Sequence, residues 1–251
     1  MVVATGAYAT PRIPDFASQL DPAIKQLHSV SYRNPDQLRD GPVLVVGAGN
    51  SGVEIALDLA PRHRVWLAGR DTGFIPADHG SFAYRAGAVV FHALTQRLTV
   101  DTLPGRWLVE KAKAFTGGAP VVGIKPYDLL KAGIQRVPRM IGVDGGQPVL
   151  EDGRVLNVGN MIWATGFVQN SFSAWIKLPV FDAKGEPIHH RGVVPSEPGL
   201  YFVGLPFQSS LLSGIVAGAG PDAKYVVQQI LTRTRAAQRE SGGNRFACRP
   251  R

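Results

Sequence analysis

The clearest feature of the hydrophobic pattern is a continuous run of four apolar residues at positions 43–46. A glycine-rich turn, GAGNSG, follows the run, and apolar residues at helical spacing occupy positions 53–59. Strands that are buried on both faces of a parallel sheet are apolar at every position, whereas an amphipathic helix is apolar on one side only. The segment 43–70 therefore predicts a strand, a tight turn, a helix and a second strand.

Shorter patterns surround this segment. Residues 2–6 resemble a short strand that ends in glycine, and the segments 82–94 and 104–115 have helical spacing and predict a helical insertion. Residues 136–166 alternate short apolar strands with Gly and Asp turns, as in a small meander. LYFVG reads as a further strand, and residues 209–231 predict a closing helix. The alternation of strands and helices indicates an α/β protein with a parallel sheet.

Composition and charge narrow the class of protein. The chain is 45% hydrophobic and 18% charged, as in an ordinary globular protein. Most of the formal net charge of +8 lies in the arginine-rich segment 232–251, which we expect to be a disordered tail, so we expect no nucleic-acid partner. No apolar run reaches the roughly 18 residues of a membrane span, and a cytoplasmic location is expected. The single cysteine, Cys248, excludes disulfide and CxxC chemistry.

The turn at residues 47–52 fits the GxGxxG fingerprint of dinucleotide-binding proteins, directly after a strand and at the start of a helix. Gly47 permits the tight turn, Gly49 lets the backbone approach a pyrophosphate, and Gly52 permits close packing of helix on strand. The amino end of the helix favours negative charge. The alternative is a glycine turn without a ligand. We expect the turn to bind a nucleotide through Gly47, Ala48, Gly49, Asn50, Ser51 and Gly52.

The residue that distinguishes NADP from NAD lies about 20 positions after the fingerprint, at the end of the second strand. Arg70 occupies this place, and a guanidinium can pair with the 2′-phosphate of NADPH. Asp71 is the alternative, because an acid there would accept the ribose hydroxyls of NAD if the strand ended one residue later. We expect NADP to be the nucleotide and Arg70 to contact its 2′-phosphate.

Two ATG turns, Ala4-Thr5-Gly6 and Ala164-Thr165-Gly166, bracket the fingerprint. With the segments VVATGAY, LVVGAGNSG, MIWATGF and LYFVGLPF, they resemble the flavin-containing monooxygenase-like FAD/NAD(P)-dependent oxidoreductases, flavoproteins with two dinucleotide-binding domains and relatives of the Baeyer-Villiger enzymes. The resemblance covers almost the whole chain except its tail. It implies a Rossmann-like NAD(P)-binding domain with a helical insertion at 41–149, inserted in an incomplete FAD-binding domain at 1–40 and 150–231.

The resemblance also implies the cofactors and the reaction. NADP and FAD are expected, with hydride passing from NADPH to FAD and oxygen then being transferred from molecular oxygen to a small organic substrate. The ATG turns add Thr5, Gly6, Ala164, Thr165 and Gly166 to the expected cofactor-binding residues. No catalytic residue and no metal ligand are named, because the cofactor carries the chemistry. A flavin-dependent reductase without oxygenation and a non-enzymatic NADP(H)-binding remnant are the alternatives.

Two departures from the family pattern bear on activity. The family's own GxGxxG for the FAD pyrophosphate is not in this sequence, so we expect the isolated chain to bind flavin poorly and to depend on a homodimer or a separate amino-terminal FAD-binding chain. The fingerprint FxGxxxHxxx(W, Y or F) is matched only at His28 and Tyr32, since Pro22 and Ile24 stand at its Phe and Gly places. His28 is then either a structural histidine bonded to backbone or the linker histidine that couples domain movement to the flavin.

Two other regions carry expectations. Trp163, beside the second ATG turn, is expected to pack rather than react. Gly204 and residues 208–210 match the family region that approaches the flavin, and a helix cap without a ligand is the alternative. The pair His189-His190 has no recognisable metal-ligand spacing.

Replacing Arg70 tests the nucleotide preference. If Arg70 contacts the 2′-phosphate, Arg70→Ala should weaken NADPH binding by roughly 1.5–3 kcal/mol, the value of a charge-assisted contact, and leave NADH binding nearly unchanged. Isothermal titration calorimetry with both nucleotides measures the difference. Equal losses for the two would mean that Arg70 serves the fold and not the choice of cofactor.

Overall fold

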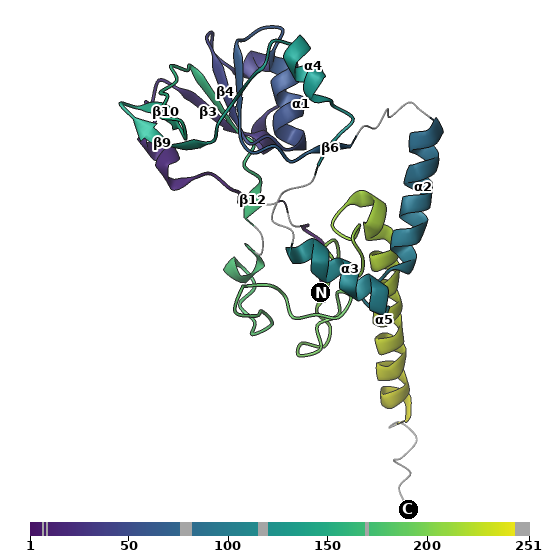
Figure 1. Ribbon diagram of the computed structural model, residues 1–251. Helices are drawn as coiled ribbons and strands as arrows, with labels where there is room; N and C mark the ends of the chain where they lie inside the picture. The colour runs from purple at the N-terminus through teal and green to yellow at the C-terminus, as the bar shows by residue number, and fades with distance from the viewer. Residues whose placement is uncertain (7, 9, 76–81, 115–119, 169–170, 244–251) are drawn as a thin grey trace, which may run out of the picture. The chain divides into compact units, whose positions relative to one another are not determined.

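The computed structural model describes residues 1–6, 8, 10–75, 82–114, 120–168 and 171–243 (Figure 1). The chain divides into two compact units, each built from several segments. Unit 1 comprises Met1–Ala9, Gly87–Phe115 and Gln169–Arg251, and unit 2 comprises Thr10–Ala86 and Thr116–Val168. The chain passes from one unit to the other shortly after each of the two ATG turns.

Unit 2 is built on a five-stranded sheet whose neighbouring strands are all parallel. In spatial order the strands are β3 (Lys25–His28), β11 (Asn160–Trp163), β4 (Val43–Val46), β5 (Val65–Ala68) and β8 (Gln135–Val137). Every residue of β4, β5 and β11 is buried. This burial explains the continuously apolar runs in the sequence, because both faces of the sheet are covered.

Alternate residues of the strands supply the two faces of the sheet. Val43, Val45 and Leu67 pack with helices α1 (Asn50–Leu59) and α4 (Pro126–Lys131). Leu44, Trp66 and Trp163 lie in a second core with residues of other elements. These elements are the 3-10 helix η1 (Asp15–Gln19) and the antiparallel strands β9 (Met140–Asp144) and β10 (Gln147–Leu150). The predicted meander therefore begins at β8, an edge strand of the sheet, and continues into β9 and β10, which pack against one face of the sheet.

Short ribbons and turns complete unit 2. Strand β2 (Thr10–Pro11) pairs antiparallel with β12 (Phe167–Val168), and β6 (Phe74–Ile75) pairs parallel with β7 (Val121–Val122). The 3-10 helices η2 (Ser29–Ser31) and η3 (Pro35–Gln37) join β3 to β4.

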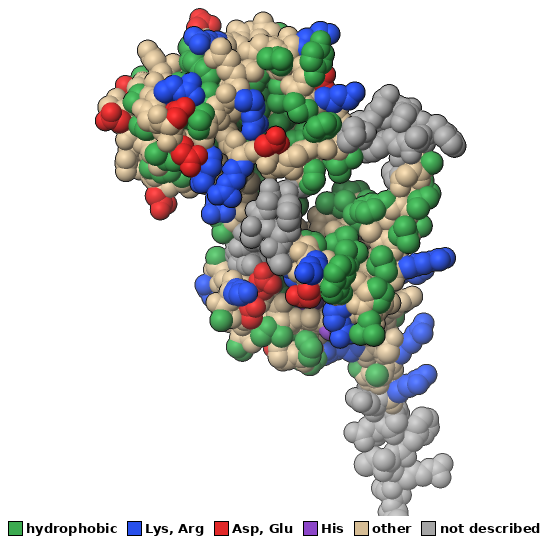
Figure 2. Space-filling model, viewed as in Figure 1, with side chains coloured by type: hydrophobic (Ala, Val, Ile, Leu, Met, Phe, Trp, Pro, Cys, Tyr) green, Lys and Arg blue, Asp and Glu red, His purple; other side chains and the backbone are tan. Residues whose placement is uncertain are grey.

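Unit 1 contains a small core of buried apolar residues and several helices. Strand β1 (Val2–Val3) pairs parallel with β13 (Tyr201–Phe202). Val3 and Phe202 pack there with apolar residues between 172 and 205. The remaining elements are η4 (Ser171–Ala174), α3 (Leu103–Ala114), α5 (Val216–Gly243) and α2 (Phe82–Arg97) from Gly87 onward. Helix α2 carries exposed hydrophobic side chains in Figure 2, among them Val89, Val90, Phe91 and Leu94.

The compact units differ from the domain bounds expected from the sequence. Strands β3 and β11 lie outside 41–149, yet they belong to the sheet of the glycine turn. Residues 87–115 of the expected insertion belong to unit 1. Parallel pairing explains the difference, because it joins strands that are distant in the sequence.

The expected disordered tail, 232–251, is also corrected in part. Helix α5 runs to Gly243, so residues 232–243 are helical, and residues 244–251 lie outside the described part of the chain. Ala, Arg, Gln and Glu predominate after Leu231, and their high helix propensity explains the extension. Among the described residues no helix is long and apolar enough to cross a membrane.

The buried Asn160 allows a test of how the segment before β4 is held to the sheet. Its side-chain oxygen accepts from the backbone N–H of Arg39 at 2.9 Å, and its side-chain nitrogen donates to the Arg39 carbonyl at 2.8 Å. These bonds hold the segment before β4 to the inner strand β11. Asn160→Ala leaves both backbone groups without this partner, so the free energy of unfolding should fall by about 1–3 kcal/mol. Urea denaturation followed by circular dichroism measures the loss. The exposed Asn157→Ala is the control and should change stability by about 0.5 kcal/mol or less; equal stabilities of the two variants would contradict the anchoring role.

Candidate functional site

The glycine turn stands where β4 ends and α1 begins. Gly47 has a φ of +112°, a region that favours glycine, and its N–H donates to the Ala68 carbonyl at 2.8 Å. A Cβ on Gly47 would overlap the carbonyl oxygen of Ala164, and one on Gly52 would overlap the carbonyl oxygen of Gly47. These two glycines are therefore required by close packing within unit 2.

Gly49 has the opposite surroundings. It is the N-cap residue of α1 with φ −80° and ψ −173°, and its side-chain position has no atom within 4 Å. Space is therefore open next to the amino end of a ten-residue helix. Backbone N–H groups at such an end point outward and attract anions.

The other residues of the turn have different roles. The Asn50 side chain donates to the Pro120 carbonyl at 3.1 Å and accepts from the Val122 N–H at 2.9 Å, so it fastens β7 to the start of α1. Ser51 is exposed, and Ala48 is buried. Among the six residues expected at the nucleotide, the structure thus assigns Asn50 a bonding role within the protein.

The second ATG turn lies against the glycine turn in unit 2. The Ala164 N–H donates to the Val46 carbonyl at 2.8 Å, and its Cβ would lie 3.2 Å from a Cβ placed on Gly52. The Thr165 hydroxyl donates to the carbonyl of Arg12, whose N–H donates to the Gly166 carbonyl at 3.0 Å. Thr165 is thus bonded to Arg12, the residue that follows β2, while Ala164 packs against the glycine turn.

His28, at the end of β3, is buried and bonded to backbone through both ring nitrogens. Its Nδ1 accepts from the Val30 N–H at 3.2 Å, so Nε2 carries the proton and donates to the Gly166 carbonyl at 2.9 Å. Its ring also meets the Phe167 ring edge-on at 5.2 Å. These bonds match the structural alternative for His28. The linker role remains a prediction.

Tyr32, the other fingerprint residue, is bonded to α1. Its hydroxyl donates to the Asp58 carboxylate at 2.6 Å. Burial, and next the hydrogen bond to Asp58, raise the pKa of the Tyr32 phenol above its ordinary value. The phenol therefore stays protonated at neutral pH and holds η2 to α1.

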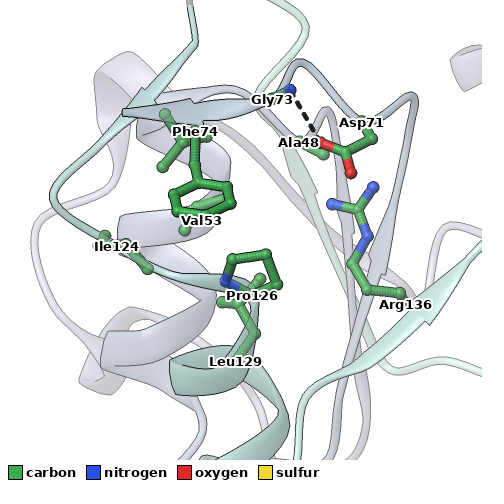
Figure 3. Close-up of a pocket in the computed structure, with 10 residues that line it drawn as sticks. Ala48, Val53, Asp71, Gly73, Phe74, Ile124, Pro126, Leu129 and Arg136 are labelled. Atoms are coloured by element: carbon green, nitrogen blue, oxygen red, sulfur yellow. Dashed lines mark hydrogen bonds between the residues drawn. The ribbon is translucent and has the colours of Figure 1, made fainter. Parts of the chain in front are cut away.

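A cavity of about 110 Å³ opens beside the glycine turn (Figure 3). Ala48 and Val53 reach it from the turn and α1, and most of its wall is apolar. Asp71 and Arg136 line the polar side, and their charged ends point toward one another in Figure 3. The remaining lining residues are Gly73, Phe74, Val121, Ile124, Pro126 and Leu129.

The end of β5 lies next to this cavity. Gly69 has a φ of +142°, and a Cβ there would lie 3.0 Å from the Ala48 nitrogen, so glycine lets β5 approach the turn. Arg136 donates to the Gly69 carbonyl at 3.1 Å. Arg70, which sequence analysis selected, is exposed and is not among the residues that line the cavity. Gly69 and Arg136 were not predicted from the sequence, although a glycine at the end of the second strand was a visible signal for Gly69.

The residues expected at the flavin lie in unit 1. Thr5 and Gly6 follow β1 and belong to unit 1, whereas the second ATG turn belongs to unit 2. Gln208 is 2% exposed, accepts from the Leu205 N–H at 3.3 Å and donates to the Arg191 carbonyl at 3.3 Å. Ser209 donates to the buried Asp222. The polar groups of Gln208 and Ser209 are therefore bonded inside unit 1.

The two neighbouring histidines of unit 1, His189 and His190, contact different partners. His189 accepts from the Gly192 N–H at 3.1 Å, and burial, with contributions from Lys113 and His190, lowers its pKa to about 4. His190 lies 3.1 Å from the Asp101 carboxylate. Among the described residues no group of three or more His, Cys, Asp or Glu side chains is placed to hold a metal ion.

Comparison with known proteins agrees with this geometry. Residues 1–81 match the family model described as pyridine nucleotide-disulphide oxidoreductase. An oxidoreductase of Geobacillus kaustophilus described as CzcO-like is 36% identical over 239 residues, which cover 92% of this chain and 64% of the relative. The chain thus spans just under two thirds of that relative's length.

Two solved structures share the fold. The flavin-containing monooxygenase from Stenotrophomonas maltophilia has a TM-score of 0.62 at 20% identity, over 93% of this chain and 62% of its own. OTEMO, solved in complex with FAD and NADP, has a TM-score of 0.57 at 12% identity, over 94% of this chain and 62% of its own. The expected α/β fold of proteins with two dinucleotide-binding domains is therefore confirmed, and the chain is similar in sequence to the CzcO-like oxidoreductase.

Proposed function

We propose that this chain binds NADPH at the glycine turn of unit 2 and forms the nucleotide-binding part of an FAD-dependent oxidoreductase of the monooxygenase type. The observation that carries the proposal is the open space at Gly49 between two glycines that close packing requires. A turn used only for packing would need Gly47 and Gly52, whereas a side chain would fit at position 49.

The residues present fit a dinucleotide. The N–H groups at the start of α1 would receive the pyrophosphate, and Gly49 would let it approach. The apolar cavity beside Ala48 would receive the adenosine end, because ligand sites combine an apolar wall with a few polar groups. When bound, NADPH supplies a hydride, and the protein orients it.

The fit to FAD is weaker among the described residues. Gln208 and Ser209 are bonded within unit 1, and the sequence contains one GxGxxG turn, which we assign to NADPH. The relatives support FAD as the second cofactor, molecular oxygen as the oxidant and a small organic molecule as the substrate. Pairing with a second chain and a cytoplasmic location remain predictions from the sequence.

Gly49→Ala tests the proposal without disturbing the fold. The backbone angles of Gly49 suit alanine, and its Cβ would meet no atom, so stability should fall by no more than about 1 kcal/mol, the difference between Gly and Ala at a helix N-cap. The methyl group would occupy the place of the pyrophosphate, so NADPH and NADH should both bind about tenfold more weakly, or about 1.4 kcal/mol. Calorimetric titration measures both affinities.

Gly142→Ala in β9 is the matched control, because its Cβ would also meet no atom and no residue of β9 lines the cavity beside the turn. It should bind both nucleotides as the unchanged chain does. Unaltered affinity in Gly49→Ala, or no binding by the unchanged chain, would contradict the proposal. Adding FAD and recording the flavin spectrum during NADPH oxidation tests the second cofactor separately.

A further inference from the structure

The cavity beside the glycine turn contains one cation and one anion among its described lining residues, Arg136 and Asp71. Figure 3 shows the Arg136 guanidinium and the Asp71 carboxylate on the same side, opposite Phe74 and Ile124. The apolar wall suits a base, and the charged side suits a ribose with its substituents. The charges at this side therefore bear on which nucleotide is preferred.

Arg136 is held in position by the sheet. It lies on β8, opposite Leu67 of the parallel strand β5. One of its terminal nitrogens donates to the Gly69 carbonyl at 3.1 Å, which orients the side chain along the end of β5. A guanidinium has five N–H donors in a planar fork, so this single bond leaves donors to contact a phosphate.

Asp71 has the opposite effect on a phosphate. Its carboxylate accepts from the Gly73 N–H at 2.8 Å, which holds it at the cavity rim. A carboxylate at this place accepts ribose hydroxyls but repels a 2′-phosphate. NADPH therefore needs a cation in the cavity that offsets the charge of Asp71. Arg70 directly precedes Asp71 in the sequence, but it is exposed and does not line the cavity.

We propose that Arg136 is a specificity-determining residue of the nucleotide site: its guanidinium receives the 2′-phosphate of NADPH and offsets the charge of Asp71. This inference rests on the proposed binding of NADPH at the glycine turn. It assigns selectivity to a residue of β8, two strands away from β4 in the sheet order, whereas the sequence pattern placed selectivity directly after β5.

Arg136→Gln tests the inference, because it removes the charge and keeps a polar side chain. NADPH should bind about tenfold more weakly, and NADH should stay within about twofold. Asp71→Asn should act in the opposite direction and tighten NADPH about threefold, because it removes a like charge near the phosphate. Arg64→Gln is the matched control: Arg64 is an exposed arginine just before β5 that stacks over Trp66, and it should change neither affinity.

The outcomes separate this inference from the proposed function. Binding of both nucleotides by the unchanged chain, with unaltered discrimination in Arg136→Gln, would overturn the role of Arg136 alone. An equal loss of NADPH and NADH in Arg136→Gln would also overturn it, since Arg136 would then act only through the position of Gly69. Binding of neither nucleotide by the unchanged chain would overturn the proposed function and this inference together.

Discussion

The close approach of three backbone segments at Gly47, Gly52 and Ala164 is the constraint on which unit 2 depends. No side chain fits between them, so the end of β4, the start of α1 and the second ATG turn lie in direct contact. This contact fixes where the amino end of α1 opens, and it places Ala48 at the cavity. The functional site is therefore a consequence of how tightly the helix packs on the sheet.

Much of this centre was predictable because its signals are local. The run 43–46, the glycine turn and the helix after it are contiguous in the sequence, and each has a pattern with a physical cause. The positions of β3 and β11 in the same sheet were not predictable in this way. Their pairing joins segments that are far apart along the chain, and no local pattern records which parallel strands become neighbours.

The site residues divide in the same way, into those with a local sequence signal and those that only the pairing of distant strands brings to the site. Gly47 and Gly52 could be read from spacing, and the structure supplies the packing reason. Arg136 could not, because only the pairing of β5 with β8 brings it to the end of β5. Asn50 shows the reverse case: its position in the fingerprint suggested a ligand contact, but its amide is bonded to the backbone of residues 120 and 122.

The distribution of the four tryptophans gives the two units different optical signals. Trp66 and Trp163 are buried in unit 2, and Trp163 donates to Gln26 at 3.0 Å, whereas Trp107 and Trp175 in unit 1 are 63% and 52% exposed. Buried indoles emit at shorter wavelengths than those in water. Intrinsic fluorescence therefore distinguishes the loss of structure in unit 2, which shifts emission to the red, from changes confined to unit 1, whose indoles already contact solvent.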